Sequence, residues 1–162
     1  MRLAWTAAAL LVALLLQSIL GVVAPDQGRI VDPFLLVVVY CGLMGGETHG
    51  MLAGVAAGWV QDIHFAGPVA GLSALTKLLV GFGVGVAGNR FLITGTAPRI
   101  LTLFVAALTD AILFERLALV FEIPSGSLSI LALLGRATAN ALAGAVIFEL
   151  VEMRFPRKEV RL

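Results

Sequence analysis

The chain has 162 residues, of which 60% are hydrophobic and only 13% are charged, and its mean hydropathy is +1.04. A soluble domain carries about 45–50% apolar and about 25% charged residues, so this composition excludes a soluble protein. It predicts an all-α integral membrane protein in which residues 1–162 form a single transmembrane domain. The single cysteine, Cys41, excludes a disulfide framework within the chain. We expect membrane lipids and membrane proteins as partners, and no nucleic acid.

The first predicted span is Leu3–Val23, which is long enough to cross a hydrocarbon core of about 30 Å. It exceeds the roughly 7–15 apolar residues of a signal-peptide core, so we expect it to remain uncleaved. Two short apolar segments follow, Pro33–Met44 and Met51–Val60, separated by the sequence GGETHG at 45–50. Three glycines, a carboxylate and a histidine suit a turn better than a helix interior, so we predict a turn there. We expect a loop at 63–70.

Three longer segments complete the chain: Leu72–Gly88, Ile100–Phe121 and Leu128–Val151. A polar connection at 89–99 and a turn at 124–127 separate them. The sequence therefore predicts a compact bundle of about six transmembrane helices, of which the two central ones are short.

Charge placement predicts the orientation of this bundle. With six spans, nearly all basic residues outside the spans fall on one side, which the positive-inside rule assigns to the cytoplasm. These residues are Arg2, Arg90, Arg99, Arg154, Arg157, Lys158 and Arg161. The C-terminus is then cytoplasmic, and so is the N-terminus. If 33–62 were instead one kinked helix, five spans with an external N-terminus would satisfy the rule equally well, so charge alone leaves both topologies open.

A stripe of glycines marks the centre of the chain. Glycine recurs at every fourth position from Gly42 to Gly58, which places these residues on one face of a helix. Small residues allow helix backbones to approach closely in a bilayer. We therefore predict a packing surface, either against another helix of this chain or against a partner helix. Its residues are Gly50, Gly54, Gly58, Gly81 and Gly85.

Ionisable residues in or near the spans form a second candidate site, because charges inside a membrane need a partner or a role. The set comprises Asp62, Lys77, Asp110, Glu115, Arg116 and Arg136, together with the polar Asn140. It is interpreted either as a polar pocket or proton path, or as a charge network that fixes helix register. We favour the structural network because positive and negative groups are equal in number.

Depth along the helices suggests particular partners within this set. At 1.5 Å per residue, Asp110 lies roughly 16 Å and Arg136 roughly 12 Å from the outer ends of their helices, which is compatible with an ion pair. Lys77 is expected to reach Asp62 or Glu115, or to extend outward along its aliphatic stem.

Catalytic chemistry is not indicated. His49 and His64 are expected in loops at opposite ends of one short segment, and neither has a second His or Cys at ligand spacing. The sequence contains neither a serine-nucleophile motif nor a phosphate-binding loop. We predict no enzyme activity, no catalytic residue, no cofactor and no metal.

The central motifs also resemble a known family. The sequence GVAAGWVQD at 54–62 is followed by GPVAGLSAL at 67–75, and then by Lys77 and Gly81. This pattern resembles the rod shape-determining protein MreD family, and the likeness in length and hydropathy extends over the whole chain. The resemblance implies a scaffold of the cell-elongation machinery in the bacterial inner membrane. It also implies association with MreC, a single-span protein, and through MreC with MreB, RodA and penicillin-binding protein 2, in support of rod shape and peptidoglycan synthesis.

The resemblance carries an alternative function. The MreD family is similar in fold to the substrate-binding S components of energy-coupling-factor vitamin transporters, which dock their membrane partner through an Ala-x-x-x-Ala face on the first helix. Such spacings occur here at Ala4/Ala8 and Ala9/Ala13. The outer loops are short and lack a distinctive polar set, which favours the scaffold.

Overall fold

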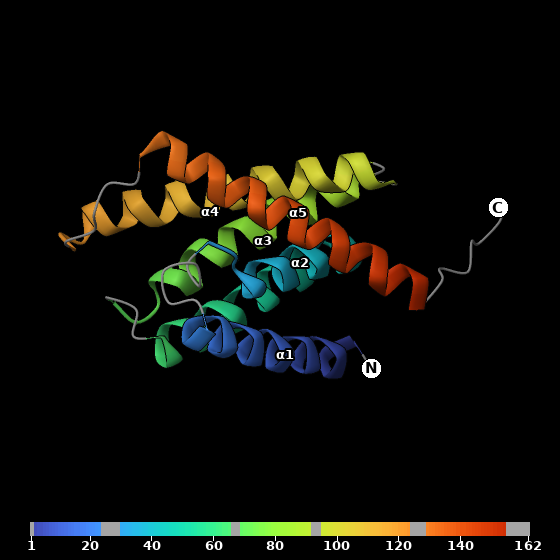
Figure 1. Cartoon of the computed structure of the whole chain (residues 1–162), viewed down its shortest axis with the longest axis horizontal. Coiled ribbons are helices and arrows are strands. Elements are labelled where there is room, and N and C mark those ends of the chain that lie inside the picture. Colours follow the sequence, from blue (N-terminus) through green and yellow to red (C-terminus); the bar gives the residue numbers. More distant parts are fainter. Residues whose placement is uncertain (1, 24–29, 66–68, 92–94, 124–128, 155–162) are drawn as a thin grey trace.

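The computed structural model describes residues 2–23, 30–65, 69–91, 95–123 and 129–154, and all regular structure in these ranges is helical (Figure 1). The five helices are α1 (Arg2–Val23), α2 (Pro33–His64), α3 (Leu72–Arg90), α4 (Thr96–Val120) and α5 (Ile130–Arg154). Four of them, α1, α2, α3 and α5, are long and apolar enough to cross a membrane. The all-helical fold and these four helices agree with the predicted multi-pass membrane protein. Helix α4 is not among the four.

Helix α2 reverses direction in its middle. A straight helix of its length would extend about 48 Å. Gly46, however, has non-helical backbone angles (φ 78°, ψ −174°), and the rings of Phe34 and Phe65, from opposite ends of the segment, lie 6.2 Å apart. The element therefore consists of two antiparallel arms, a first arm at 33–45 and a second arm at 47–64. Glycine suits the reversal because a positive φ is strained for residues that carry a Cβ atom.

The reversal lies inside the predicted GGETHG turn, but the structure differs from the expectation in extent. Only Gly46 leaves helical geometry, and 47–50 already belong to the second arm. The prediction that His49 is a loop residue was therefore wrong. The structure has five helical elements rather than the six separate segments that we expected, because one residue suffices to turn the chain.

Two other predicted boundaries were also wrong. The second arm continues to His64, so the connection to α3 begins later than predicted. Helix α4 starts at Thr96, inside the segment expected to be a polar connection. Pro98 lies in the first turn of α4, where the missing N–H and the fixed φ of proline are tolerated.

The arrangement has two distinct ends. The start of α1 and the end of α5 lie at the same end of the bundle, at the right in Figure 1. Gly46 belongs to this end, because the residues that follow it contact the start of α1 and the end of α3. Nε2 of His49 lies 3.0 Å from Oγ1 of Thr6 in α1, and Oε2 of Glu47 lies 3.4 Å from Nδ2 of Asn89 in α3. We call it the Gly46 end. At the opposite end, the Asp62 end, the second arm finishes and α3 begins.

Backbone contact between the second arm and α3 forms the centre of the bundle. A Cβ atom on Gly54 would overlap the backbone of Lys77, and one on Gly58 would overlap Ala74. The same close approach involves Gly50 against Gly81, and Gly85 against Glu47. The glycine stripe therefore packs against another helix of this chain, which is one of the two alternatives that the sequence left open.

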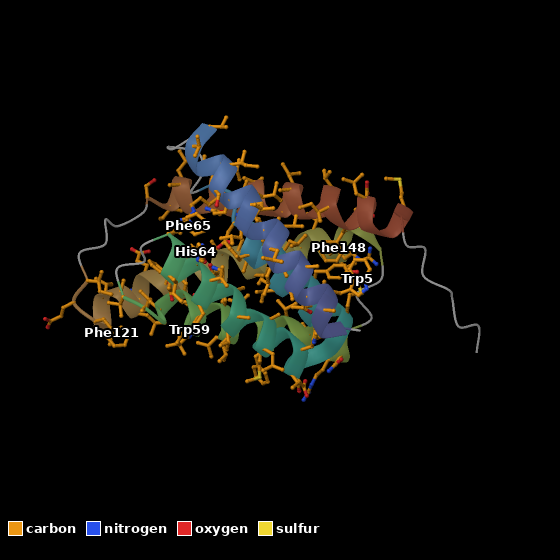
Figure 2. All side chains as sticks on the ribbon, turned by 90° about the horizontal axis from the view of Figure 1, so that it is seen from below. Trp5, Trp59, His64, Phe65, Phe121 and Phe148 are labelled. Atoms are coloured by element: carbon orange, nitrogen blue, oxygen red, sulfur yellow. The ribbon has the colours of Figure 1, made fainter. Side chains whose placement is uncertain are left out.

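Apolar side chains surround this contact. One buried cluster joins the first arm, α3, α4 and α5, with Leu36, Val84, Leu103 and Phe148 among its members. Helix α1 packs against α2 and leaves most of its apolar surface exposed, as Figure 2 shows with α1 in front. Exposed apolar side chains suit a surface that faces lipid, which is as apolar as they are.

Two exposed tryptophans lie toward opposite ends of the bundle. Trp5 on α1 is 62% exposed and Trp59 on the second arm is 59% exposed (Figure 2). Tryptophan is enriched at both membrane–water interfaces, where its ring is apolar and its N–H can reach water. Their positions fit a bundle whose long axis crosses the bilayer.

A matched pair of glycine substitutions tests the backbone contact. Gly54→Ala is expected to lower the free energy of unfolding by about 1–3 kcal/mol, because the added methyl group forces two backbones apart. Gly83→Ala in α3 is the control, since nothing lies within 4 Å of its Cβ position. It is expected to be neutral, or to stabilise by up to about 1 kcal/mol through helix propensity. Equilibrium unfolding in mixed micelles measures both; equal effects would show that the stripe makes no close contact.

Candidate functional site

Five polar side chains from four helices converge inside the bundle, in the half nearer the Asp62 end. We call this group the polar centre; it consists of Asp32, Gln61, Lys77, Asp110 and Asn140. Nζ of Lys77 lies 2.7 Å from Oδ2 of Asp32 and 3.4 Å from Oδ2 of Asp110. The Lys77 side chain is only 2% exposed, and each of the two aspartates is 14% exposed. One buried ammonium is therefore shared by two carboxylates.

Asp32 belongs to the polar centre because of the way in which α2 begins. It is the N-cap of α2 and is followed by a proline at the first helical position, a combination that favours helix initiation. Its Oδ1 accepts a hydrogen bond from the backbone N–H of Leu35 at 3.1 Å. Its Oδ2 faces Lys77 and also accepts from Nε2 of Gln61 at 3.4 Å. One carboxylate thus both caps a helix and neutralises a lysine.

Asn140 of α5 holds the segment that leads into α2. Its Oδ1 accepts from the backbone N–H of Asp32, and its Nδ2 donates to the carbonyl oxygen of Ile30, each at 2.8 Å. Nδ2 also donates to the Arg136 carbonyl oxygen one turn earlier, at 2.8 Å. Buried amides need such partners. Asn140 therefore fixes the entry of the first arm against α5.

Asp62 lies apart from the polar centre and caps α3. Helix α3 follows Gly71, which has a positive φ (98°) and no side chain to cap with. The Asp62 carboxylate provides the cap from the second arm. It accepts from the backbone N–H groups of Gly71 at 2.8 Å, Ser73 at 3.2 Å and Ala74 at 3.4 Å. A carboxylate is favourable there because it complements the positive end of the helix dipole.

Two acceptor atoms of the polar centre have no donor. Oδ1 of Asp110 and Oε1 of Gln61 are buried and have no hydrogen-bond partner among the described residues. The Thr76 hydroxyl, which lies beside Asp110, donates to the Ser73 carbonyl oxygen at 3.1 Å. An unmade hydrogen bond at a buried acceptor is costly, so these atoms mark a place where a donor is missing.

The structure brings together part of the predicted charge network. Lys77 pairs with Asp110, and Asn140 is joined to this pair through Asp32. The suggested pair of Asp110 with Arg136 was wrong, because Lys77 is the partner. Lys77 pairs with neither Asp62 nor Glu115, and its burial excludes an outward extension to water. Glu115, Arg116 and Arg136 form no ion pair with another described residue. At 100° per residue, Glu115 lies on a different face of α4 from Asp110.

Sequence reasoning missed Asp32 and Gln61. The available signal for Asp32 was the Asp-Pro pair before an apolar segment, which is typical of a helix start. Asp32 directly precedes the segment predicted at Pro33–Met44, and nothing in the local pattern relates it to a lysine 45 positions later. Gln61 lies beside Asp62 in the resemblance motif, but its amide faces the first arm while the Asp62 carboxylate faces α3.

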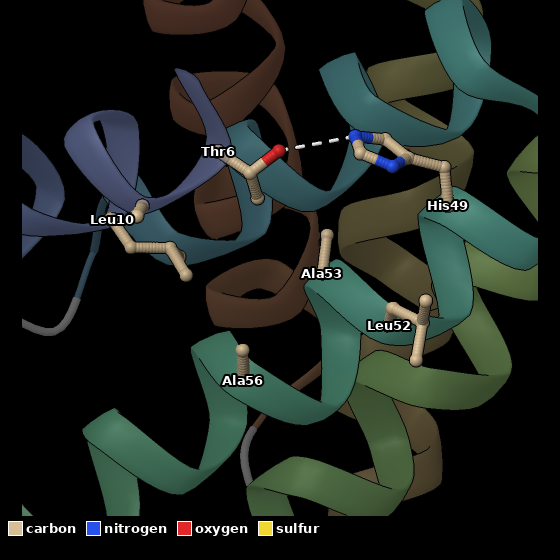
Figure 3. Close-up of a pocket in the computed structure, with 7 residues that line it drawn as sticks. Thr6, Leu10, His49, Leu52, Ala53 and Ala56 are labelled. Carbon is tan, nitrogen blue, oxygen red and sulfur yellow. Dashed lines mark hydrogen bonds between the residues drawn. The ribbon is translucent and has the colours of Figure 1, made fainter. Parts of the chain in front are cut away.

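A separate hollow lies between α1 and the second arm (Figure 3). Its volume is about 190 Å³, and Thr6 and His49 form a hydrogen bond of 3.0 Å on its lining. The remaining lining residues are apolar: Ala7, Leu10, Leu52, Ala53 and Ala56. Ligand pockets typically occupy about 300–1,000 Å³, so this hollow is small for an organic ligand. Among the described residues, no three His, Cys, Asp or Glu side chains are grouped to hold a metal.

Comparison with known proteins finds no matching protein-family model, no matching curated protein and no matching solved structure. Any functional assignment therefore rests on the residues and their geometry.

Substitution of the buried lysine tests the pairing. Lys77→Met is expected to lower the free energy of unfolding by about 3–5 kcal/mol, because it leaves the buried carboxyl groups of Asp32 and Asp110 without their cation. Arg136→Met is the control, and we expect it to cost less than about 1 kcal/mol because Arg136 has no ion pair with a described residue. Equilibrium unfolding of both variants decides the question; a larger loss for Arg136→Met would restore the pair of Asp110 with Arg136.

Proposed function

We propose that this chain is a non-enzymatic membrane scaffold of the bacterial cell-elongation machinery, as its resemblance to the MreD family implies. One observation carries the proposal: the residues of the resemblance form one structural unit. Gly54 and Gly58 pack on the backbone of α3, and Asp62 caps the start of α3. In this unit the motif residues make architectural contacts, which is what a scaffold requires of them.

The partner in this proposal is an MreC-like single-span membrane protein, which connects the scaffold to MreB, RodA and penicillin-binding protein 2. The polar centre supports a structural role, because Lys77 ties the start of the first arm to α3 and α4, and Asn140 ties it to α5. Such ties oppose sliding of the helices along one another. A bundle held in register presents a constant surface to a partner.

The proposed location is the bacterial inner membrane, with the Gly46 end in the cytoplasm. Arg90 at the end of α3 and Arg99 at the start of α4 both lie at that end. Helix α1 begins at that end with Arg2, and α5 finishes there with Arg154. The positive-inside rule therefore favours this orientation. The predicted basic tail at 157–161 lies outside the described residues.

Six crossings follow in this proposal if each arm of α2 is counted separately and α4 is counted as a crossing beside the four apolar helices. At 1.5 Å per residue, the second arm extends about 27 Å and the first arm only about 20 Å. An arm shorter than the hydrocarbon core is tolerated when the charged group at its end is neutralised by other residues of the bundle. Asp32, at the start of the first arm, meets that condition through Lys77 and Asn140.

Partner capture and depletion test the scaffold. The tagged chain, co-expressed with the MreC-like protein of its host, is expected to retain that protein through purification, whereas an unrelated single-span protein is not retained. Depletion in a rod-shaped host is expected to give round cells, and re-expression should restore rods. Normal rods after complete depletion, in a host with no second copy, would rule out the proposal.

One observation favours a second function, that of an S component of an energy-coupling-factor vitamin transporter. The polar centre lies in the half of the bundle that the proposed orientation places outside, and two of its buried acceptors have no donor in the part of the chain that the structure describes. A polar ligand that enters from outside would supply donors. Ala4 and Ala8 of α1 are exposed and available to a membrane partner, whereas Ala13 is buried.

Thermal-shift screening of the purified protein against vitamins tests this second function. A ligand present at 100 times its Kd stabilises the folded state by about 2.7 kcal/mol, which raises the melting temperature. The shift is expected to disappear in Asp110→Asn if the polar centre is the site. The variant Asp62→Asn, altered outside the polar centre, should keep it. Flat melting curves across the panel would count against an S component.

A further inference from the structure

We propose that the polar centre binds one proton, held on the carboxyl group of Asp110. The protonated centre then contains one ammonium, one carboxylate and one neutral carboxylic acid. This goes beyond a scaffold role, because it makes the interior of the bundle a site that exchanges a proton with the surrounding water.

The proposal follows first from the charge of the cluster. Lys77 contributes one positive charge, whereas Asp32 and Asp110 contribute two negative charges if both are ionised. The excess negative charge would lie in an apolar interior, where an uncompensated charge is strongly unfavourable. Two carboxylates that share a site cannot both remain ionised without cost, so one of them takes up a proton.

Hydrogen bonding identifies Asp110 as the carboxyl group that takes the proton. Asp32 is the better-stabilised anion, with Lys77 at 2.7 Å and further donors from Leu35 and Gln61. Asp110 has a longer contact to Lys77, at 3.4 Å, and beside it lies the Thr76 hydroxyl, which donates to the Ser73 carbonyl oxygen; Oδ1 of Asp110 has no donor among the described residues. Donors favour the charged form of a carboxyl group, so their scarcity at Asp110 favours its neutral form.

The neighbouring helices supply no second cation to the cluster. Helix α5 contributes the neutral amide of Asn140, and Arg136 has no ion pair with a described residue. The second arm contributes the neutral Gln61 amide, while Asp62 is engaged at the start of α3. Helix α3 adds only the Thr76 hydroxyl beside Asp110.

Other titratable groups of these elements lie away from the cluster. His64 is exposed at the end of the second arm, and Glu115 and Arg116 lie farther along α4 toward its C-terminal end. The proton therefore comes from water. Oδ1 of Asp110 accepts H⁺ to give a carboxylic acid, and no other bond forms or breaks.

Infrared spectroscopy of the purified full chain in lipid vesicles tests the proposal directly. At neutral pH the wild type is expected to show the carbonyl band of a buried carboxylic acid, displaced when D₂O replaces H₂O. Asp110→Asn should lose this band. Asp32→Asn should lose it as well, because Asp110 then ionises to neutralise Lys77. Asp62→Asn is the matched control and should keep the band at full intensity.

Two results with the wild type alone keep the proposal falsifiable if a variant fails to fold. A wild type that shows no such band at neutral pH overturns it outright. A band that appears only when Na⁺ is replaced by choline also overturns it, because Na⁺ rather than H⁺ would then neutralise the cluster. Persistence of the band in both Asp110→Asn and Asp32→Asn would assign the proton to a carboxyl group outside the polar centre.

Discussion

The contact between the backbones of the second arm and α3 is the constraint on which the rest of the structure depends. Apolar helices gain no hydrophobic energy by meeting in lipid, so the attraction must come from many short van der Waals contacts. Glycine at Gly54 and Gly58 permits the required approach, because a Cβ atom there would overlap α3. This contact fixes the position of α3 along the axis of the second arm. It thereby also sets the position of Lys77, whose backbone lies against Gly54.

Because Lys77 is buried at this position on α3, the other helices must provide its counter-charges. The first arm begins at Asp32 inside the bundle, and α4 presents Asp110. Asn140 then joins α5 to the same point through the backbone of Asp32. The polar centre is thus a consequence of the glycine contact combined with one lysine in an apolar helix. Buried ion pairs are weak evidence for stability but can specify register, which is the role that the proposed scaffold function would require of them.

Much of this arrangement could be predicted from local sequence patterns. Hydropathy located the helical segments because lipid-exposed backbone must satisfy its own hydrogen bonds. The sequence GGETHG located the reversal, and glycine spacing located the packing face. The charge pairing could not be predicted in the same way. The depth estimate measured Asp110 and Arg136 from the predicted outer ends of their own helices, and it did not include Asp32, the N-cap of α2. From the observed helix ends, Asp110 and Asn140 both lie about 15 Å deep, whereas Arg136 lies only about 9 Å deep.

The two sets of contacts respond differently to protonation. The second arm and α3 are joined by backbone contacts and by the Asp62 cap, neither of which involves Lys77, Asp32 or Asp110 side chains. Helix α4 is tied to α3 through the longer contact of Lys77 with Asp110. Loss of the proposed proton from Asp110 would strengthen the attraction between Lys77 and Asp110. It would leave the contact between the second arm and α3 unchanged. Proton exchange would therefore act on the contact between α3 and α4 and not on the contact between the second arm and α3, so a partner bound to α4 would sense it, whereas one bound to the second arm would not.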